Sequence, residues 1–189
     1  MLRWFVRDAA SADIARETGL ERKRVLRALM IVRLALLRDA QNGVQKPAAP
    51  RAHAALIGLR VSTGRASAEV VPQAEAEPLR RWLRNRENGG AHVPRHSRPY
   101  MAVVYRGRLS RLAESGAERV PFGPIEAFWA YVQRQLRAKG GIRRERLDLY
   151  LASFTWRYNH RKVPPAQQVQ ELLGLVGGFG PVSRAGLSR

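Results

Sequence analysis

Apolar residues recur at helical spacing in the last third of the chain. Between residues 125 and 136 they are separated mostly by three or four positions, so they share one face of an α-helix. Gly140 and Gly141 are predicted to end this helix, and a second helix follows with apolar side chains inward and arginines outward. The first stripe is Ile125, Phe128, Trp129, Val132 and Leu136; the second helix turns Leu147, Leu149, Tyr150, Leu151, Phe154 and Tyr158 inward and Arg143, Arg144, Arg146 and Arg157 outward.

The N-terminal residues have the spacing of a helix-turn-helix unit. Ser11 is placed to cap a first helix, in which Ala15 must be small because a second helix crosses close to it. Gly19 supplies the left-handed turn between the two helices. The second helix is predicted to open with basic residues and to continue its helical period to about Asp39. An ordinary helical hairpin with a glycine between its helices is the alternative interpretation.

The middle of the chain alternates between short strand patterns and helical patterns. Asn42-Gly43 with Pro47 and Pro50 predicts a linker. Turn residues at 62–65 separate the first two apolar runs after it. The predicted elements are strands at 54–59 and 67–71, a helix at 75–86, a strand at 101–105 and a basic helix or loop at 106–115.

The charge balance narrows the class of partner. The chain has 34 Lys and Arg against 15 Asp and Glu, a formal net charge of +19, and most of the basic residues are Arg. Arginine forks onto phosphate oxygens, so this excess indicates a polyanionic partner, most often nucleic acid. There is no cysteine, which excludes disulfides and thiolate metal sites. No apolar run approaches the ~20 residues of a membrane helix, so we expect a cytoplasmic protein without a membrane partner.

Two phrases in the helical stretch resemble a known family. Residues 125–129 read IEAFW and residues 154–162 read FTWRYNHRK. Together they are similar to the end of the catalytic domain of DDE-type bacterial insertion-sequence transposases of the ISXO-like branch. The similarity covers the last third of the chain well and the first forty residues moderately. It implies an α/β fold: a small N-terminal helix-turn-helix unit, then an incomplete RNase H-like sheet backed by helices.

The resemblance also implies a reaction and its catalytic acids. In the family three carboxylates hold two Mg²⁺ ions that cut and join DNA, and the third acid lies in the I-E-x-F-W helix, which makes Glu126 the catalytic and metal-binding candidate. No Asp lies between residues 40 and 147, and Arg106-Gly107 stands where the family has an Asp-Gly step. The resemblance therefore implies a transposase remnant with impaired cleavage, for which Mg²⁺ binding is in doubt.

The predicted partner is double-stranded DNA at the end repeats of a mobile element, with a homo-oligomer left open. Two alternatives stay open: a helix-turn-helix DNA-binding regulator, and a basic RNA-binding structural protein. The predicted domains are a DNA-binding unit at 1–40, a linker at 41–53, a catalytic-domain remnant at 54–176 and a disordered tail at 177–189. The predicted DNA-binding residues are Arg22, Lys23, Arg24, Arg27, Arg134, Arg137, Lys139, Arg157, Arg161 and Lys162.

Overall fold

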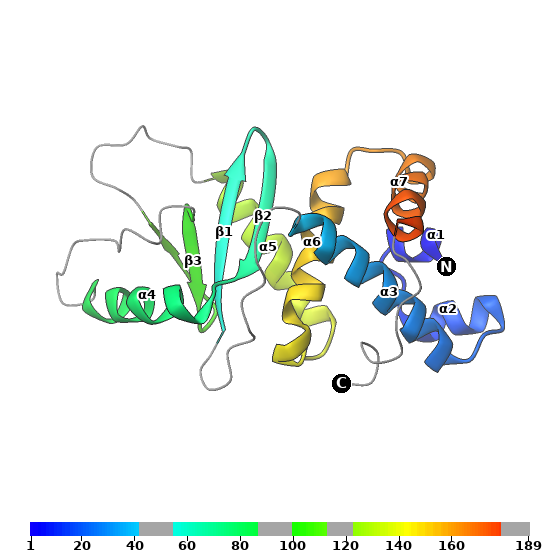
Figure 1. The fold of residues 1–189 in the computed structure, drawn as a ribbon, viewed down its shortest axis with the longest axis horizontal. Coiled ribbons are helices and arrows are strands. Elements are labelled where there is room, and N and C mark those ends of the chain that lie inside the picture. The colour runs from blue at the N-terminus through cyan, green and yellow to red at the C-terminus, as the bar shows by residue number, and fades with distance from the viewer. Residues whose placement is uncertain (42–54, 87–99, 113–122, 179–189) are drawn as a thin grey trace. The chain divides into compact units, whose positions relative to one another are not determined.

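The protein is a mixed α/β structure that separates into two compact units. The computed structural model describes residues 1–41, 55–86, 100–112 and 123–178. These residues form seven α-helices and one four-stranded antiparallel sheet (Figure 1). Unit 1 combines Met1–Val44 with Asn159–Arg189, and unit 2 is Gln45–Tyr158. Most of the predicted linker and of the predicted tail lies outside the described residues.

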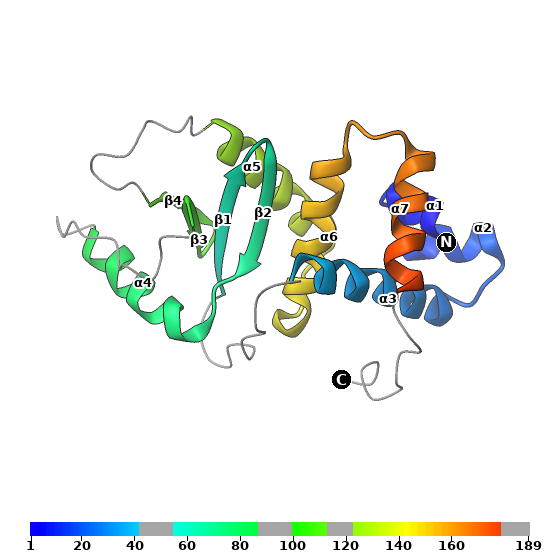
Figure 2. The ribbon, with the colours of Figure 1, turned by 45° about the horizontal axis from the view of Figure 1, so that its top comes forward.

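Unit 1 is helical. It contains α1 (Leu2–Val6), α2 (Ser11–Thr18), α3 (Arg22–Ala40) and α7 (Pro165–Gly177). Helix α7 packs against α1 and α3 (Figure 2). The sequence analysis instead assigned residues 165–176 to the predicted catalytic-domain remnant at 54–176. Apolar side chains from all four helices are buried: Phe5, Ile14, Val25, Leu29, Val32, Leu36 and Leu172.

The turn between α2 and α3 follows the sequence prediction, whereas the start of α2 does not. Gly19 ends α2 with φ 65°, which is the left-handed conformation expected of it. The predicted cap at Ser11 is wrong, because Ala10 occupies the cap position and Ser11 is the first residue of the helix. The Ser11 hydroxyl instead accepts a hydrogen bond of 3.4 Å from Nε of Arg22. It thus connects the starts of the two helices.

The sheet of unit 2 has the strand order β2-β1-β3-β4, with every neighbouring pair antiparallel. Its strands are β1 (Leu56–Ser62), β2 (Arg65–Val70), β3 (Ala102–Tyr105) and β4 (Arg108–Arg111). The sheet predicted across residues 54–105 is thus present. The predicted basic helix or loop at 106–115 is wrong for its first part, because residues 108–111 form β4. Arg106 and Gly107 make a two-residue turn with positive φ at both positions, and such turns join antiparallel strands.

Both faces of β1 are buried, each against a different helical layer. On one face Leu56, with Val103 of β3 beside it, packs against α4 (Gln73–Arg86). On the other face Ile57 and Leu59 pack with α5 (Gly123–Ala138) and α6 (Leu147–His160). Because successive side chains of a strand point to opposite faces, the apolar run of β1 serves both layers. Helices α4 and α5 accordingly cover opposite sides of the sheet in both ribbon views (Figures 1 and 2).

The two helices at the end of unit 2 match most of their predicted pattern, although Arg146 and Arg157, predicted to point outward, are half-buried. Trp129 is only 8% exposed, which confirms its place on the predicted apolar stripe, and Trp156 of the second helix is 7% exposed. Gly140 and Gly141 end α5 with φ 65° and 101°, and a short 3₁₀ turn, η2 (Arg144–Arg146), precedes α6. At the start of α6 the Asp148 carboxylate accepts a 3.3 Å hydrogen bond from the Val70 N–H. This bond attaches α6 to β2.

A tyrosine ring lies directly on the backbone of β1. A Cβ atom built on Gly58 would lie 2.3 Å from Cδ1 and Cε1 of Tyr100, so only glycine leaves room for the ring. The Arg60 guanidinium lies 5.6 Å from the centroid of the same ring. Burial, reinforced by the nearby Glu69 carboxylate, raises the pKa of the Tyr100 hydroxyl above its ordinary value. Tyr100 is therefore a neutral, packed part of the layer between β1 and α4.

The close approach of Gly58 and Tyr100 predicts a large effect of one added methyl group. Gly58→Ala should destabilise unit 2 by about 1–3 kcal/mol, because the ring must move out of a closely packed layer. The control is Gly123→Ala, where no described atom lies within 4 Å of the added Cβ. Urea denaturation of both variants measures the difference. Equal stability of the two variants would contradict the packing described here.

The left-handed turn after α2 predicts a graded response at Gly19. Gly19→Val should lower the stability of unit 1 by about 1–2 kcal/mol, since a branched residue resists positive φ. Gly19→Asn should cost less, because asparagine tolerates this conformation. No described atom lies within 4 Å of a Cβ at this position, so the backbone alone sets the difference. Thermal unfolding followed by circular dichroism should rank the wild type first, Asn second and Val last.

Candidate nucleic-acid interface

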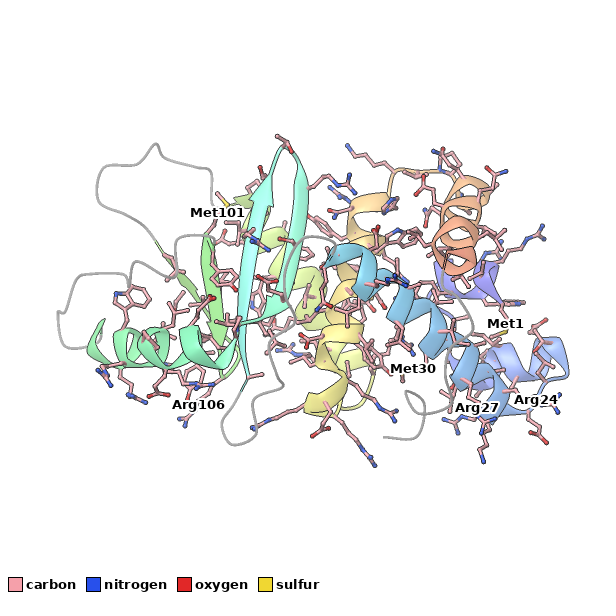
Figure 3. All side chains as sticks on the ribbon, in the orientation of Figure 1. Met1, Arg24, Arg27, Met30, Met101 and Arg106 are labelled. Carbon is pink, nitrogen blue, oxygen red and sulfur yellow. The ribbon has the colours of Figure 1, made fainter. Side chains whose placement is uncertain are left out.

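The first two turns of α3 present basic side chains to solvent. Lys23, Arg24 and Arg27 are exposed, whereas Val25 between them is completely buried. The helical period produces this separation, because residues two positions apart point to nearly opposite sides of a helix. Arg24 and Arg27 are labelled at this end of α3 in Figure 3. Helix α3 therefore packs with one face and leaves a basic face uncovered among the described residues.

Three contacts hold the start of α3 in place. Ile14 of α2 and Val25 of α3 are both fully buried, so the two helices share a core at this point. The Arg22–Ser11 hydrogen bond described above ties the first turn of α3 to the first turn of α2. The carbonyl of Glu21, the residue before α3, accepts hydrogen bonds from the N–H groups of Arg24 (2.9 Å) and Val25 (3.1 Å). The basic residues are thus carried by an anchored helix end.

The exposed face of α3 combines cationic and apolar side chains. Lys23, Leu26 and Arg27 are spaced i, i+3 and i+4, so they share one face. Leu26 is 45% exposed, although its sequence period groups it with the buried Leu29. In the described part of the chain, neither Lys23 nor Arg27 forms an ion pair with a carboxylate. The positive charge of this face is therefore available to an external anion.

The other predicted DNA-binding residues lie on different elements. Arg134 and Arg137 are exposed on α5 of unit 2, and the Arg134 guanidinium lies 6.0 Å from the Tyr131 ring centroid. Lys139 follows α5 and is half-buried. The remaining three are distributed over the end of α6 and the turn after it: half-buried Arg157 in unit 2, and exposed Arg161 and Lys162 in unit 1.

The turn that carries Arg161 and Lys162 is held by a buried glutamine, which the sequence analysis did not identify. Nε2 of Gln168 donates hydrogen bonds to the carbonyl oxygens of His160 (3.0 Å) and Val163 (2.8 Å). Nε2 of His160 lies 3.0 Å from a carboxylate oxygen of Glu171. These bonds close the connection between α6 and α7. They position the two exposed cations next to a fixed helix start.

Glu126 lies where its motif places it, in the first turn of α5, and its side chain is exposed. An acid at this position interacts favourably with the helix dipole whether or not it has another role. Among the described residues no three His, Cys, Asp or Glu side chains gather in one place. Two other acids were considered as partners for Glu126, namely Asp39 and Glu69. Asp39 belongs to unit 1, and Glu69 forms a 3.2 Å ion pair with Arg60. The donors described around Glu126 therefore do not fit a two-metal site.

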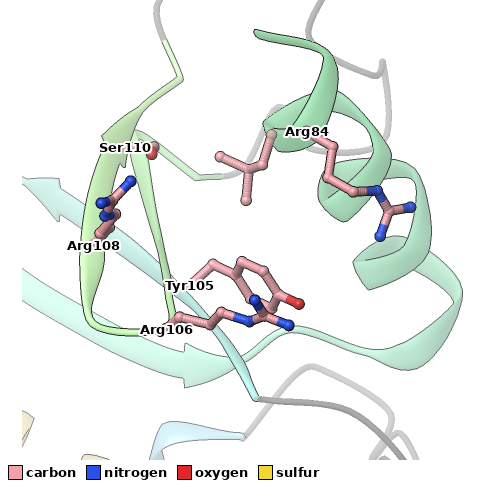
Figure 4. A pocket seen from close by; sticks show the side chains of 6 residues that line it. Arg84, Tyr105, Arg106, Arg108 and Ser110 are labelled. Atoms are coloured by element: carbon pink, nitrogen blue, oxygen red, sulfur yellow. The ribbon is translucent and has the colours of Figure 1, made fainter. Parts of the chain in front are cut away.

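A basic pocket in unit 2 was not anticipated from the sequence. It has a volume of about 480 Å³ and lies between α4 and the β3–β4 hairpin (Figure 4). The available signal was Gly107, a turn residue that directly follows the apolar run at 101–105 and one basic residue. The described residues that line the pocket are Leu83, Arg84, Tyr105, Arg106, Arg108 and Ser110.

None of the described helices has both the length and the apolar composition needed to cross a membrane. Comparisons with protein-family models, with curated proteins and with solved structures find no match to this chain.

Proposed function

We propose that the protein binds double-stranded DNA and that the start of α3 enters the major groove. The observation that carries this proposal is the basic, exposed face of α3 above the completely buried Val25. An α-helix fits the major groove, and the second helix of a helix-turn-helix unit is the one that docks there. The short turn at Gly19 and the shared core of α2 and α3 supply the rigid support that such docking needs.

The side chains on the exposed face of α3 can contact both the phosphate backbone and the base edges of DNA. Arginine can donate two parallel hydrogen bonds to the O6 and N7 atoms of guanine or to phosphate oxygens. An exposed leucine such as Leu26 can contact the methyl group of thymine, as other apolar side chains do. The net charge of +19 adds a sequence-independent attraction that strengthens as salt is lowered. Lys23, Arg24 and Arg27 are thus assigned to phosphate and base contacts.

We also propose that the chain is related to DDE-type insertion-sequence transposases and that its cleavage chemistry is impaired. Support for the relation comes from the IEAFW phrase and from the position of Glu126 in the first turn of a helix that packs on a sheet. The order strand, strand, helix, strand of β1, β2, α4 and β3 also fits the start of an RNase H-like layer that lacks its first strand, although β4 follows where a helix was expected. Support for impairment comes from the turn after β3, where Arg106 stands in place of the family's acid.

The proposed role of α3 predicts a selective loss of binding. Replacing Arg24 and Arg27 together by Gln should weaken duplex DNA binding by roughly tenfold or more, because charge-assisted contacts to phosphates or bases are lost. It should also reduce the slope of log K against log salt by about 1–2. Gel-shift titrations between low and moderate salt measure both effects.

The matched control removes two exposed arginines elsewhere, with Arg143→Gln and Arg144→Gln combined. This variant has the same net charge as the α3 variant, so a general charge effect would weaken both equally. Equal weakening would contradict a specific role for α3. Competition by structured RNA that displaces the duplex DNA at equal concentration would favour the RNA-binding alternative.

The proposed impairment predicts binding without cutting. Purified protein should show no Mg²⁺- or Mn²⁺-dependent nicking or joining of DNA. Glu126→Gln should leave duplex binding nearly unchanged, because the acids that would complete the family's site are absent from the sequence. Nicking by the wild type that disappears in Glu126→Gln would show an intact catalytic site and overturn this part of the proposal.

A further inference from the structure

The pocket in unit 2 has a composition suited to an anionic ligand. Three of the residues that line it are arginines, Arg84, Arg106 and Arg108, and Ser110 adds a hydroxyl group. None of the described lining residues is acidic, although Arg84 also lies 3.5 Å from the Glu77 carboxylate. Each guanidinium carries five N–H donors, so this ion pair leaves Arg84 able to bind a second acceptor. Phosphate oxygens match such a group of donors.

The pocket also has a surface for a flat ring. Tyr105 and Leu83 are its apolar lining residues, and the Arg106 guanidinium lies 5.3 Å from the centroid of the Tyr105 ring. Figure 4 shows Tyr105 and Arg106 side by side, with Arg108 and Ser110 on the strand opposite α4. Any of the nucleobases can stack on a tyrosine ring or on a guanidinium plane, because every base has a flat face. The volume of about 480 Å³ is within the range of small-molecule sites.

The backbone at Arg106 is held in a conformation that arginine resists. Its φ is 50°, at the first position of a turn in which Asn or Gly is preferred. The other hairpin has the same arrangement with Thr63 (φ 48°) followed by Gly64. Asparagine at either position should therefore favour the turn. This offers a way to remove the Arg106 side chain without weakening the fold.

We propose that this pocket binds a nucleoside monophosphate unit, with its base against Tyr105 and its phosphate held by the surrounding arginines. The same chemistry is presented by a free nucleotide and by the 5′-phosphorylated end of a single strand. The site lies entirely in unit 2 and does not depend on duplex binding by α3. It gives the unit that carries Glu126 a binding role of its own.

The test is isothermal titration of the full-length protein with adenosine monophosphate, inorganic phosphate and adenosine as separate probes. Adenosine monophosphate should bind more tightly than either part alone. A short oligothymidine with a 5′-phosphate, compared with the same strand lacking it, distinguishes a strand end from a free nucleotide as the source. Equal binding of adenosine monophosphate and inorganic phosphate would overturn the base-stacking part of the proposal.

Arg106→Asn and Thr63→Asn make a matched pair of variants. Both should maintain or raise the melting temperature, because both place asparagine in a left-handed turn position. Only Arg106→Asn should weaken binding of adenosine monophosphate, by roughly tenfold, through loss of a charged donor. Undetectable binding by the wild type, or equal binding by the two variants, would overturn the proposal. Combined Arg24→Gln and Arg27→Gln should leave this binding unchanged, so failure of the pocket and failure of the α3 interface can be distinguished.

Discussion

Unit 2 depends on a single strand that is buried from both sides. Strand β1 is hydrogen-bonded to β2 along one edge and to β3 along the other, so it has no free edge along the stretch it shares with β3. Its alternate side chains enter two cores, one beneath α4 and one beneath α5 and α6. The helices therefore have to lie on opposite faces of the sheet. This arrangement places the Glu126 helix on one side and the pocket beside α4 on the other.

In unit 1, too, packing determines which residues face outward. The face of α3 that carries Val25, Leu29 and Val32 is used for packing. Lys23, Arg24 and Arg27, near the start of the helix, lie off this face and are exposed. The proposed DNA surface is thus the complement of the packing surface. Its orientation is set by apolar contacts with α2 and by the Arg22–Ser11 hydrogen bond.

Local patterns were the most predictable features. Gly19 and the glycine pair at 140–141 were predicted from turn chemistry, and Trp129 from its apolar stripe, because each depends on neighbours in the sequence. Strand β4 was missed because its residues are mostly polar and its turn begins with Arg106, which is not a standard turn residue. The position of α7 was missed because its partners, α1 and α3, are more than a hundred residues away in the sequence. The pocket was missed because two of its lining residues, Arg108 and Ser110, lie on the unpredicted strand β4.

The central claim, that the first turns of α3 contact DNA, can be tested directly by mapping backbone amide chemical shifts of the full chain. Addition of a short duplex should shift the amides of Arg22–Arg27 most, with smaller changes in α2, whose first turn is bonded to that of α3. Raising the salt concentration should reverse these shifts, because the contacts release counterions. Shifts confined to α5 and α6, with none at the start of α3, would contradict the account.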